Sequence, residues 1–285
     1  MRILMALDWS EETFAAVREA GSLYDIREAI LVHAIDLGMF QSPLVADISN
    51  LQGYSEFRAS MEQAGRQLLD HTATLLPSGN VSVTRVCEFA KPAALIVDQA
   101  KERDVDLIVV GAGGKGRLGE LVLGSVSHRV ALHATCPTLI VRECEGPVKK
   151  VVVAVESHED GGRIKAWLLA HPFKQAAHLT IVSVVRAIPT TDPFNIFPVQ
   201  DWTTAALQTA KEVVTALAAD LAGQSHTIDI EVTVGDLLSV LTGWAKQSDL
   251  LVIGSHGRHG LERFLLGSIS HALLHASPCS VLIVR

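Results

Sequence analysis

A glycine pattern that occurs twice is the feature of this sequence most able to do chemistry. In residues 106–142, one glycine is followed three residues later by a second and, ten residues after that, by a Gly-Ser pair. Residues 249–285 repeat the pattern, and the two stretches align without a gap. The pattern consists of Gly111, Gly114, Gly124 and Ser125 in the first copy, and of Gly254, Gly257, Gly267 and Ser268 in the second.

This spacing predicts a phosphate site. An apolar run ends at the first glycine of each copy, where the absence of a Cβ lets the chain turn and a ligand approach the backbone. A helix is expected to begin at the Gly-Ser pair, and its free N–H groups and positive dipole end favour an anion. The alternative is a pair of tight strand-to-helix loops that bind nothing, because duplication copies a scaffold as faithfully as a function.

Composition narrows the class of protein. The chain has 285 residues, enough for about two domains, with 48% hydrophobic and 19% charged residues and a net charge of −7. Lys and Arg form no run interleaved with aromatics, which argues against a nucleic-acid partner. No apolar run is long enough for a membrane helix, and the apolar start is too short for a secretory signal. The four cysteines show no CxxC spacing, so we expect reduced thiols and a cytoplasmic protein.

The order of elements repeats in the two halves. Apolar runs predict strands at 2–8, 29–35, 81–87, 107–110 and 138–141, with helical patterns between them. After a linker at 143–147, strands are expected at 150–156, 179–185, 227–234, 250–253 and 281–284, with a helix at about 161–173 after the first of them. Alternating strands and helices predict parallel sheets with right-handed crossovers. We therefore expect an α/β protein with domains at 1–145 and 146–285.

Several short segments together resemble the universal stress protein family. They are the G-x2-G-x9-G-S pattern after a strand beginning Asp-Leu, the Leu7-Asp8-Trp9-Ser10 ending of the first strand, and Val32-His33-Ala34 in the second. The resemblance covers essentially the whole chain, twice. It implies two tandem, doubly wound, five-stranded parallel sheets of strand order 3-2-1-4-5, with the adenine nucleotide alpha hydrolase-like fold. Ligands then bind at the carboxyl ends of strands 1 and 4, where the strand order switches.

The resemblance also implies a ligand, namely ATP (or ADP or AMP), with any Mg²⁺ held by the phosphates. In the first half, the nucleoside and ribose contacts fall to Asp8, Ala34, Gly111 and Gly114, and the phosphate contacts to Gly124, Ser125 and the N–H of Val126. In the second half, the same roles fall to Val184, Gly254, Gly257, Gly267, Ser268 and Ile269. The implied function is that of a nucleotide-binding stress-response or regulatory protein.

The halves depart from the pattern in different ways. Glu156 stands where the family expects the short acid of Asp8, and its extra methylene would intrude into the nucleoside pocket. Ala90 stands where the second half has Gly235. We expect the first half to be the better nucleotide site.

Other nucleotide-binding and metal-binding motifs fit this sequence less well. Gly111-x-Gly113-x-x-Gly116 matches the dinucleotide fingerprint, but it follows the fourth strand and the second copy lacks it. Neither loop has the Gly-Lys-Ser/Thr of a Walker A motif. His158, His256 and His259 are interpreted as solvated loop residues, so no metal ligand is predicted. A role near phosphate remains open for the equivalent residues His128 and His271.

No nucleophile is placed beside a base, so no catalytic residue is predicted and hydrolysis of ATP would be slow at most. The alternative to a nucleotide-binding regulator is a non-catalytic scaffold or sensor of the same fold, with one or both pockets empty or holding a different small ligand.

The last strand of each half, 138–141 and 281–284, is apolar and would be a sheet edge. An exposed apolar edge invites association. We therefore expect an intramolecular pseudo-dimer of the two halves, and a homodimer is left open.

Overall fold

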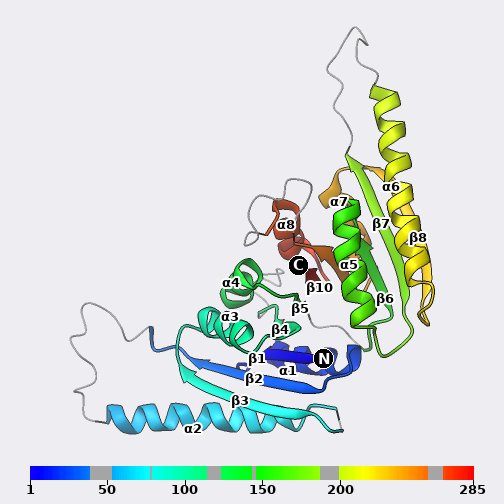
Figure 1. Ribbon diagram of the computed structural model, residues 1–285. Helices are drawn as coiled ribbons and strands as arrows, with labels where there is room; N and C mark the ends of the chain where they lie inside the picture. The colour runs from blue at the N-terminus through cyan, green and yellow to red at the C-terminus, as the bar shows by residue number, and fades with distance from the viewer. Residues whose placement is uncertain (39–52, 78, 114–122, 143–145, 187–198, 256–265) are drawn as a thin grey trace. The chain divides into compact units, whose positions relative to one another are not determined.

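The computed structural model describes residues 1–38, 53–77, 79–113, 123–142, 146–186, 199–255 and 266–285. The chain forms two compact units, unit 1 (Met1–Glu143) and unit 2 (Cys144–Arg285) (Figure 1). Each unit has the alternation of strands and helices that the sequence predicts.

Unit 1 is a five-stranded parallel sheet with helices on both faces (Figure 1). Its strand order is β3-β2-β1-β4-β5, so the predicted order 3-2-1-4-5 is confirmed. The elements are β1 (Arg2–Ala6), α1 (Glu11–Leu23), β2 (Glu28–Ile35), α2 (Tyr54–Ala73), β3 (Ser82–Phe89), α3 (Pro92–Glu102), β4 (Leu107–Gly111), α4 (Ser125–His133) and β5 (Thr138–Val141).

Unit 2 repeats this topology with the order β8-β7-β6-β9-β10. Helix α5 packs against α6, and α7 packs against α8. The elements are β6 (Lys150–Ala154), α5 (His158–Ala170), β7 (His178–Arg186), α6 (Val199–Leu221), β8 (Thr227–Gly235), α7 (Leu237–Ala245), β9 (Leu250–Gly254), α8 (Ser268–Ala276) and β10 (Ser280–Val284).

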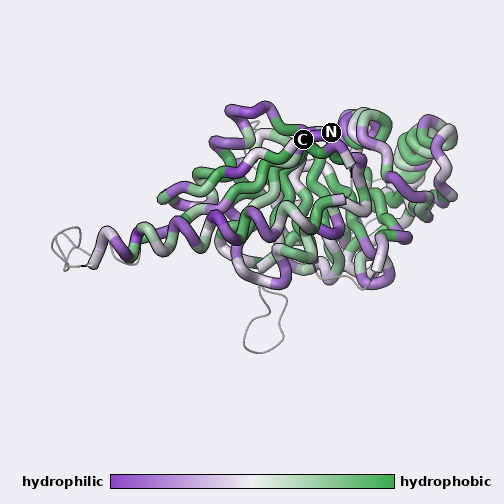
Figure 2. The backbone as a smooth tube through the Cα atoms, turned by 90° about the horizontal axis from the view of Figure 1, so that it is seen from below, coloured by the Kyte–Doolittle hydropathy of each residue, from purple (hydrophilic) through white to green (hydrophobic). Residues whose placement is uncertain are grey.

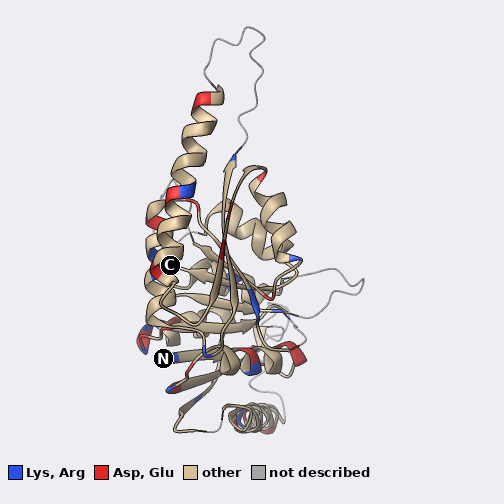
Figure 3. Cartoon of the chain, turned by 90° about the vertical axis from the view of Figure 1, so that its right-hand side faces the viewer, with Lys and Arg blue, Asp and Glu red and all other residues tan. Residues whose placement is uncertain are grey.

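The central strands are continuous apolar runs because both faces of each sheet are covered. Every residue of β5, β9 and β10 is buried. Figure 2 shows the strands as the apolar layer, while α2 alternates between hydrophilic and apolar residues as a helix with one solvated face should. Acidic and basic residues are interspersed along the helices (Figure 3). Among the described residues, no helix is long and apolar enough to cross a membrane.

Several element boundaries differ from the prediction, two of them for a clear local reason. The first strand was expected to reach residue 8 but ends at Ala6, because Asp8 turns back to serve the start of α1. The helix expected at 161–173 begins at His158, because the side chain of Ser157 caps it by accepting a hydrogen bond from the N–H of Asp160.

An aspartate fixes the start of the first strand in each unit. Oδ2 of Asp106 accepts a hydrogen bond of 2.6 Å from the N–H of Arg2. Oδ2 of Asp249 accepts two hydrogen bonds of 2.8 Å, from the N–H groups of Lys149 and Lys150. These are the residues that open the repeated stretch, so the repeat begins with a carboxylate that holds the fourth strand of each unit against the first.

Helix α2 approaches the sheet closely at Gly65. A Cβ at this position would lie 2.6 Å from Sγ of Cys87 on β3 and 2.8 Å from Cδ2 of His33 on β2. Because real Cβ atoms do not come so close to other atoms, only glycine fits between the helix and these two strands. Burial raises the pKa of the Cys87 thiol.

Replacing Asp249 by alanine should destabilise unit 2, because the N–H groups of Lys149 and Lys150 lose their acceptor. We expect a loss of about 1–3 kcal/mol in the free energy of unfolding, measured by urea denaturation of the full chain. Asp249→Asn keeps one acceptor oxygen, so its free energy of unfolding should fall clearly less than that of Asp249→Ala. An Asp249→Ala protein as stable as wild type would show that these hydrogen bonds do not hold the strand.

Candidate functional site

The candidate site of unit 1 lies where the strand order switches. Strands β1 and β4 are parallel neighbours, with Met5 opposite Val109, so their carboxyl ends meet at the same edge of the sheet. Strand β2 lies on the other side of β1. The predicted residues Ala34, Asp8 and Gly111 are therefore brought to one edge, in that order across the sheet.

Asp8 is held at this edge by the start of helix α1. Its Oδ1 accepts hydrogen bonds from the N–H of Ser10 at 3.0 Å, from the hydroxyl of Ser10, and from the hydroxyl of Thr13 at 2.7 Å. Partial burial opposes ionisation, but the hydrogen bonds from Ser10 and Thr13 outweigh it, and the nearby imidazole of His33 adds to them, so the pKa of Asp8 is lowered. Asp8 is therefore a fixed carboxylate. His33 is fixed in turn, because its Nδ1 lies 2.8 Å from the carbonyl oxygen of Leu7.

The start of helix α4 is tied to the end of β4 by two hydrogen bonds. The N–H of Gly124 donates to the carbonyl oxygen of Ala112 at 2.7 Å, and the hydroxyl of Ser127 donates to the carbonyl oxygen of Gly111 at 2.5 Å. Gly113 has a φ of +96°, and a Cβ on it would lie 2.8 Å from the backbone of Gly124. Glycine is therefore required at position 113 both for its conformation and for the close backbone contact.

The first turn of α4 is suited to an anion. Its N-cap is Gly124, and no side chain caps the helix. Ser125 is the first helical residue and is exposed, and Val126 behind it is half-buried. The N–H groups of this turn thus lie at the positive end of the helix without a capping side chain.

Unit 2 repeats the connection between helix and strand. The N–H of Gly267 donates to the carbonyl oxygen of Ser255 at 2.7 Å. The hydroxyl of Ser270 donates to the carbonyl oxygen of Gly254 at 2.8 Å. Helix α8 also has a glycine N-cap, Gly267, and no side-chain cap. Ser268 is exposed at its first position.

The first turns of α1 and α5 differ at two positions, one of which lies at the strand end. Counting from the capping serine of each helix, Asp160 takes the place of Thr13. Asp160 is buried and its Oδ2 accepts a hydrogen bond of 3.2 Å from the N–H of Glu156. Within the described part of the chain, no group donates a hydrogen bond to its Oδ1, and Nη2 of Arg163 lies 3.7 Å from that atom.

Burial raises the pKa of Asp160 from 3.8 to about 6. The N–H of Glu156 and the guanidinium of Arg163 oppose this shift, while the carboxylate of Glu156 adds to it. The end of the first strand is therefore different in the two units: unit 1 has a carboxylate held by two hydroxyl-bearing side chains, and unit 2 has a buried carboxyl group close to a second acid.

The strand-end glycines Gly111 and Gly254 have a structural role apart from any ligand. A Cβ on Gly111 would lie 3.1 Å from the backbone of Glu12 in α1. A Cβ on Gly254 would collide with the carboxyl group of Asp160 in α5. In both units, the glycine lets the first turn of the first helix pack on the end of the fourth strand.

The remaining predicted residues are placed as follows. Ala34 pairs with Glu88 in the β2–β3 ladder, and Val184 is buried in β7 opposite Thr233. Ile269 is half-buried in the first turn of α8. Gly114 and Gly257 lie outside the described residues, as do His256 and His259.

Sequence reasoning missed four residues of these sites: Thr13, Ser127, Ser270 and Asp160. The signal for Ser127 and Ser270 was their equivalence in the two copies of the repeat, two positions after each Gly-Ser serine. Asp160 stands three residues after Ser157, the spacing of a capping box, which marks a helix start but does not reveal what the carboxyl group is packed against.

Comparison with known proteins decides the family. The sequence profile of the Universal stress protein family matches residues 1–142 and again residues 147–285. The chain belongs to the universal stress protein family. It carries two tandem copies of the family's domain, so the predicted resemblance is confirmed.

Relatives and solved structures agree with this membership. A universal stress protein of Mycolicibacterium smegmatis is 28% identical over 293 residues, covering 99% of this chain and 96% of its own length. A universal stress protein of Mycobacterium tuberculosis is 28% identical over 300 residues, covering 99% of this chain and 96% of its own length. The crystal structure of a universal stress protein from Archaeoglobus fulgidus covers 100% of this chain and 96% of its own, with a TM-score of 0.63 and 18% identity, which supports the fold.

Asp160 predicts a pH dependence of stability in unit 2. Because its pKa in the folded protein, about 6, lies above the ordinary 3.8, the folded unit binds a proton more tightly than the unfolded chain. Its contribution to stability is therefore favourable in acid and falls as the pH rises from about 4 to about 6. The full loss corresponds to about 3 kcal/mol.

The variant Asp160→Asn keeps the acceptor for the N–H of Glu156 but cannot ionise. Its free energy of unfolding should exceed that of wild type by an amount that increases from pH 4 to pH 7. Urea denaturation at a series of pH values measures this difference. Asp201→Asn, at an exposed acid on α6, serves as the control and should show no such growth. If the curves of Asp160→Asn and wild type run parallel across this range, the carboxyl group does not titrate as we predict.

Proposed function

We propose that this tandem universal stress protein is a stress-response or regulatory protein that binds ATP, or another adenine nucleotide, in unit 1. The observation that carries the proposal is the first turn of α4, which has a glycine N-cap, has no capping side chain and is tied to the end of β4. Such a turn offers a row of N–H groups at the positive end of a helix, which is the arrangement that favours phosphate.

Asp8 supports a nucleoside beside the phosphates. Within the described part of unit 1, the hydrogen bonds to its carboxylate all end on Oδ1. An ionised carboxylate accepts hydrogen bonds only, so it suits the hydroxyl groups of a ribose better than a phosphate. The order of Ala34, Asp8 and Gly111 across the sheet edge then corresponds to base, ribose and phosphate, with the main chain near Ala34 facing the base.

The residues present fit ATP in charge and hydrogen-bonding type. Ser125 at the start of α4 offers a hydroxyl and an N–H to a phosphate, and Val126 offers a second N–H. Bound Mg²⁺ would be held by the phosphates, since this ion commonly keeps several waters and few protein ligands.

Unit 2 is proposed to be the weaker nucleotide site. Its α8 start matches that of α4, but the adjacent strand end carries Glu156 and the buried Asp160 in place of the arrangement around Asp8. Two acids near one another repel a polyphosphate, and the field is strongest where water is excluded. This difference also favours the second candidate function, that of a sensor or scaffold, for unit 2 alone.

The proposed role is binding rather than catalysis, with slow hydrolysis of ATP at most, because no base is placed beside a nucleophile among the described residues of either candidate site. We propose a cytoplasmic location, with which the thiols of Cys87, Cys136 and Cys279 agree, as none of them forms a disulfide. Pairing of the two units through their last strands, and any homodimer, stay predictions.

Calorimetric titration of the full chain with ATP tests the proposal. We expect binding with a dissociation constant on the order of micromolar. Native mass spectrometry of freshly purified protein should show a retained adenine nucleotide. Absence of ATP and ADP binding at about 1 mM, roughly the weak limit of useful affinity, would contradict the proposed function.

The difference between the units is tested by two matched variants. Ser125→Ala removes one hydroxyl donor from an exposed helix start and should weaken ATP binding by about tenfold, the cost of one hydrogen bond to a charged group. Ser268→Ala makes the same change in unit 2 and should weaken it less. Equal losses in the two variants would remove the case for unit 1 as the main site.

A further inference from the structure

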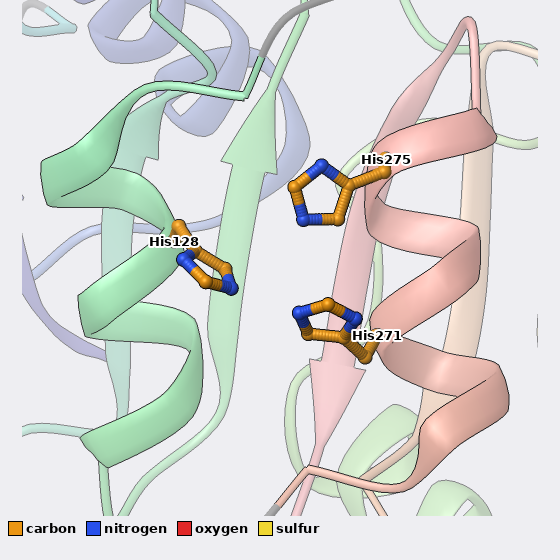
Figure 4. Close-up of side chains that lie close together, drawn as sticks. All are labelled: His128, His271 and His275. Carbon is orange, nitrogen blue, oxygen red and sulfur yellow. The ribbon is translucent and has the colours of Figure 1, made fainter.

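Two histidines lie one above the other on helix α8 of unit 2. His271 and His275 are four residues apart, which places them on the same face of the helix. Their ring centroids are 4.9 Å apart and the rings are inclined by 50° (Figure 4). His271 is half-buried and His275 is exposed.

The spacing of the ring nitrogens is close to that of a metal chelate. The ligand nitrogens that the two histidines offer lie within 4.8 Å of one another. Two imidazoles on one tetrahedral Zn²⁺, each bonded at about 2.1 Å, have nitrogens roughly 3.4 Å apart. Two histidines four residues apart on one face of a helix are a known arrangement for holding zinc.

The position in the helix also favours a cation. His275 lies in the last turn of α8, where the negative end of the helix dipole attracts positive charge. The pair is not simply inherited from the duplication. Helix α4 of unit 1 has the equivalent of His271 in His128, also labelled in Figure 4, but it has Leu132 in place of His275.

We propose that His271 and His275 form a chelate site for a divalent transition-metal ion such as Zn²⁺, with the remaining positions filled by water or by further ligands. Neutral imidazole nitrogens suit Zn²⁺, Ni²⁺ and Cu²⁺ and exclude Mg²⁺ and Ca²⁺, which prefer oxygen. The proposal does not rest on nucleotide binding in unit 1. Unit 2 would thus bind a metal ion through these two histidines.

The test is calorimetric titration of the metal-free full chain with Zn²⁺ and, separately, with Ni²⁺, in the absence of nucleotide. Wild type should bind each metal with a dissociation constant on the order of micromolar. His275→Leu introduces the residue that unit 1 carries at this position. It should weaken binding by at least about tenfold, because the second ligand no longer adds to the first. His271→Ala should do the same.

The control is His158→Ala, which removes an exposed histidine from the first turn of α5, where no second histidine follows at four residues. It should bind both metals as wild type does. Circular dichroism confirms that each variant is folded. Failure of wild type to bind Zn²⁺ at 100 µM, or undiminished binding by folded His275→Leu, would overturn the proposal.

Discussion

The hydrogen bonds between the start of the fourth helix and the end of the fourth strand are the constraint on which each site depends. In unit 1 they join Gly124 to Ala112 and Ser127 to Gly111. They tie the start of the helix directly to the end of the strand. A row of N–H groups is thus fixed beside the end of the first strand before any ligand arrives, which spares the entropy of ordering it on binding.

The fold could be predicted from the sequence because its signals are local or repetitive. Apolar runs of strand length and their alternation with helices predicted parallel sheets, and the resemblance to the universal stress protein family implied the strand order now observed in both units. The helix starts at Ser125 and Ser268 were predicted from the Gly-Ser pairs and are observed. What was not predicted depends on side-chain contacts that the folded backbone creates, both across a turn and between distant segments. Thr13 reaches Asp8 only through the turn between them, and the chain alone does not reveal that Asp160 packs on Gly254.

The two units show how a duplicated domain diverges without losing its fold. A hydroxyl at Thr13 both donates and accepts, so it can hold the neighbouring acid without a charge of its own. A carboxyl group in the same helix position, Asp160, accepts from the main chain instead and becomes a buried acid. Together with Glu156 in place of Asp8, this change replaces a site built around a hydrogen-bonded carboxylate with one built around a proton-binding group. The surrounding backbone hydrogen bonds are the same in both units.

The close approach of α2 at Gly65 has a consequence for how this surface can vary. The helix, Cys87 and His33 together fill the available volume, so an atom added to any one of them has to be matched by atoms removed from another. The three positions therefore behave as one steric unit, although they lie on three separate segments. Alkylation or oxidation of the Cys87 sulfur adds atoms to the same space. Atoms added to the sulfur on the side that faces Gly65 therefore push α2 away from the sheet.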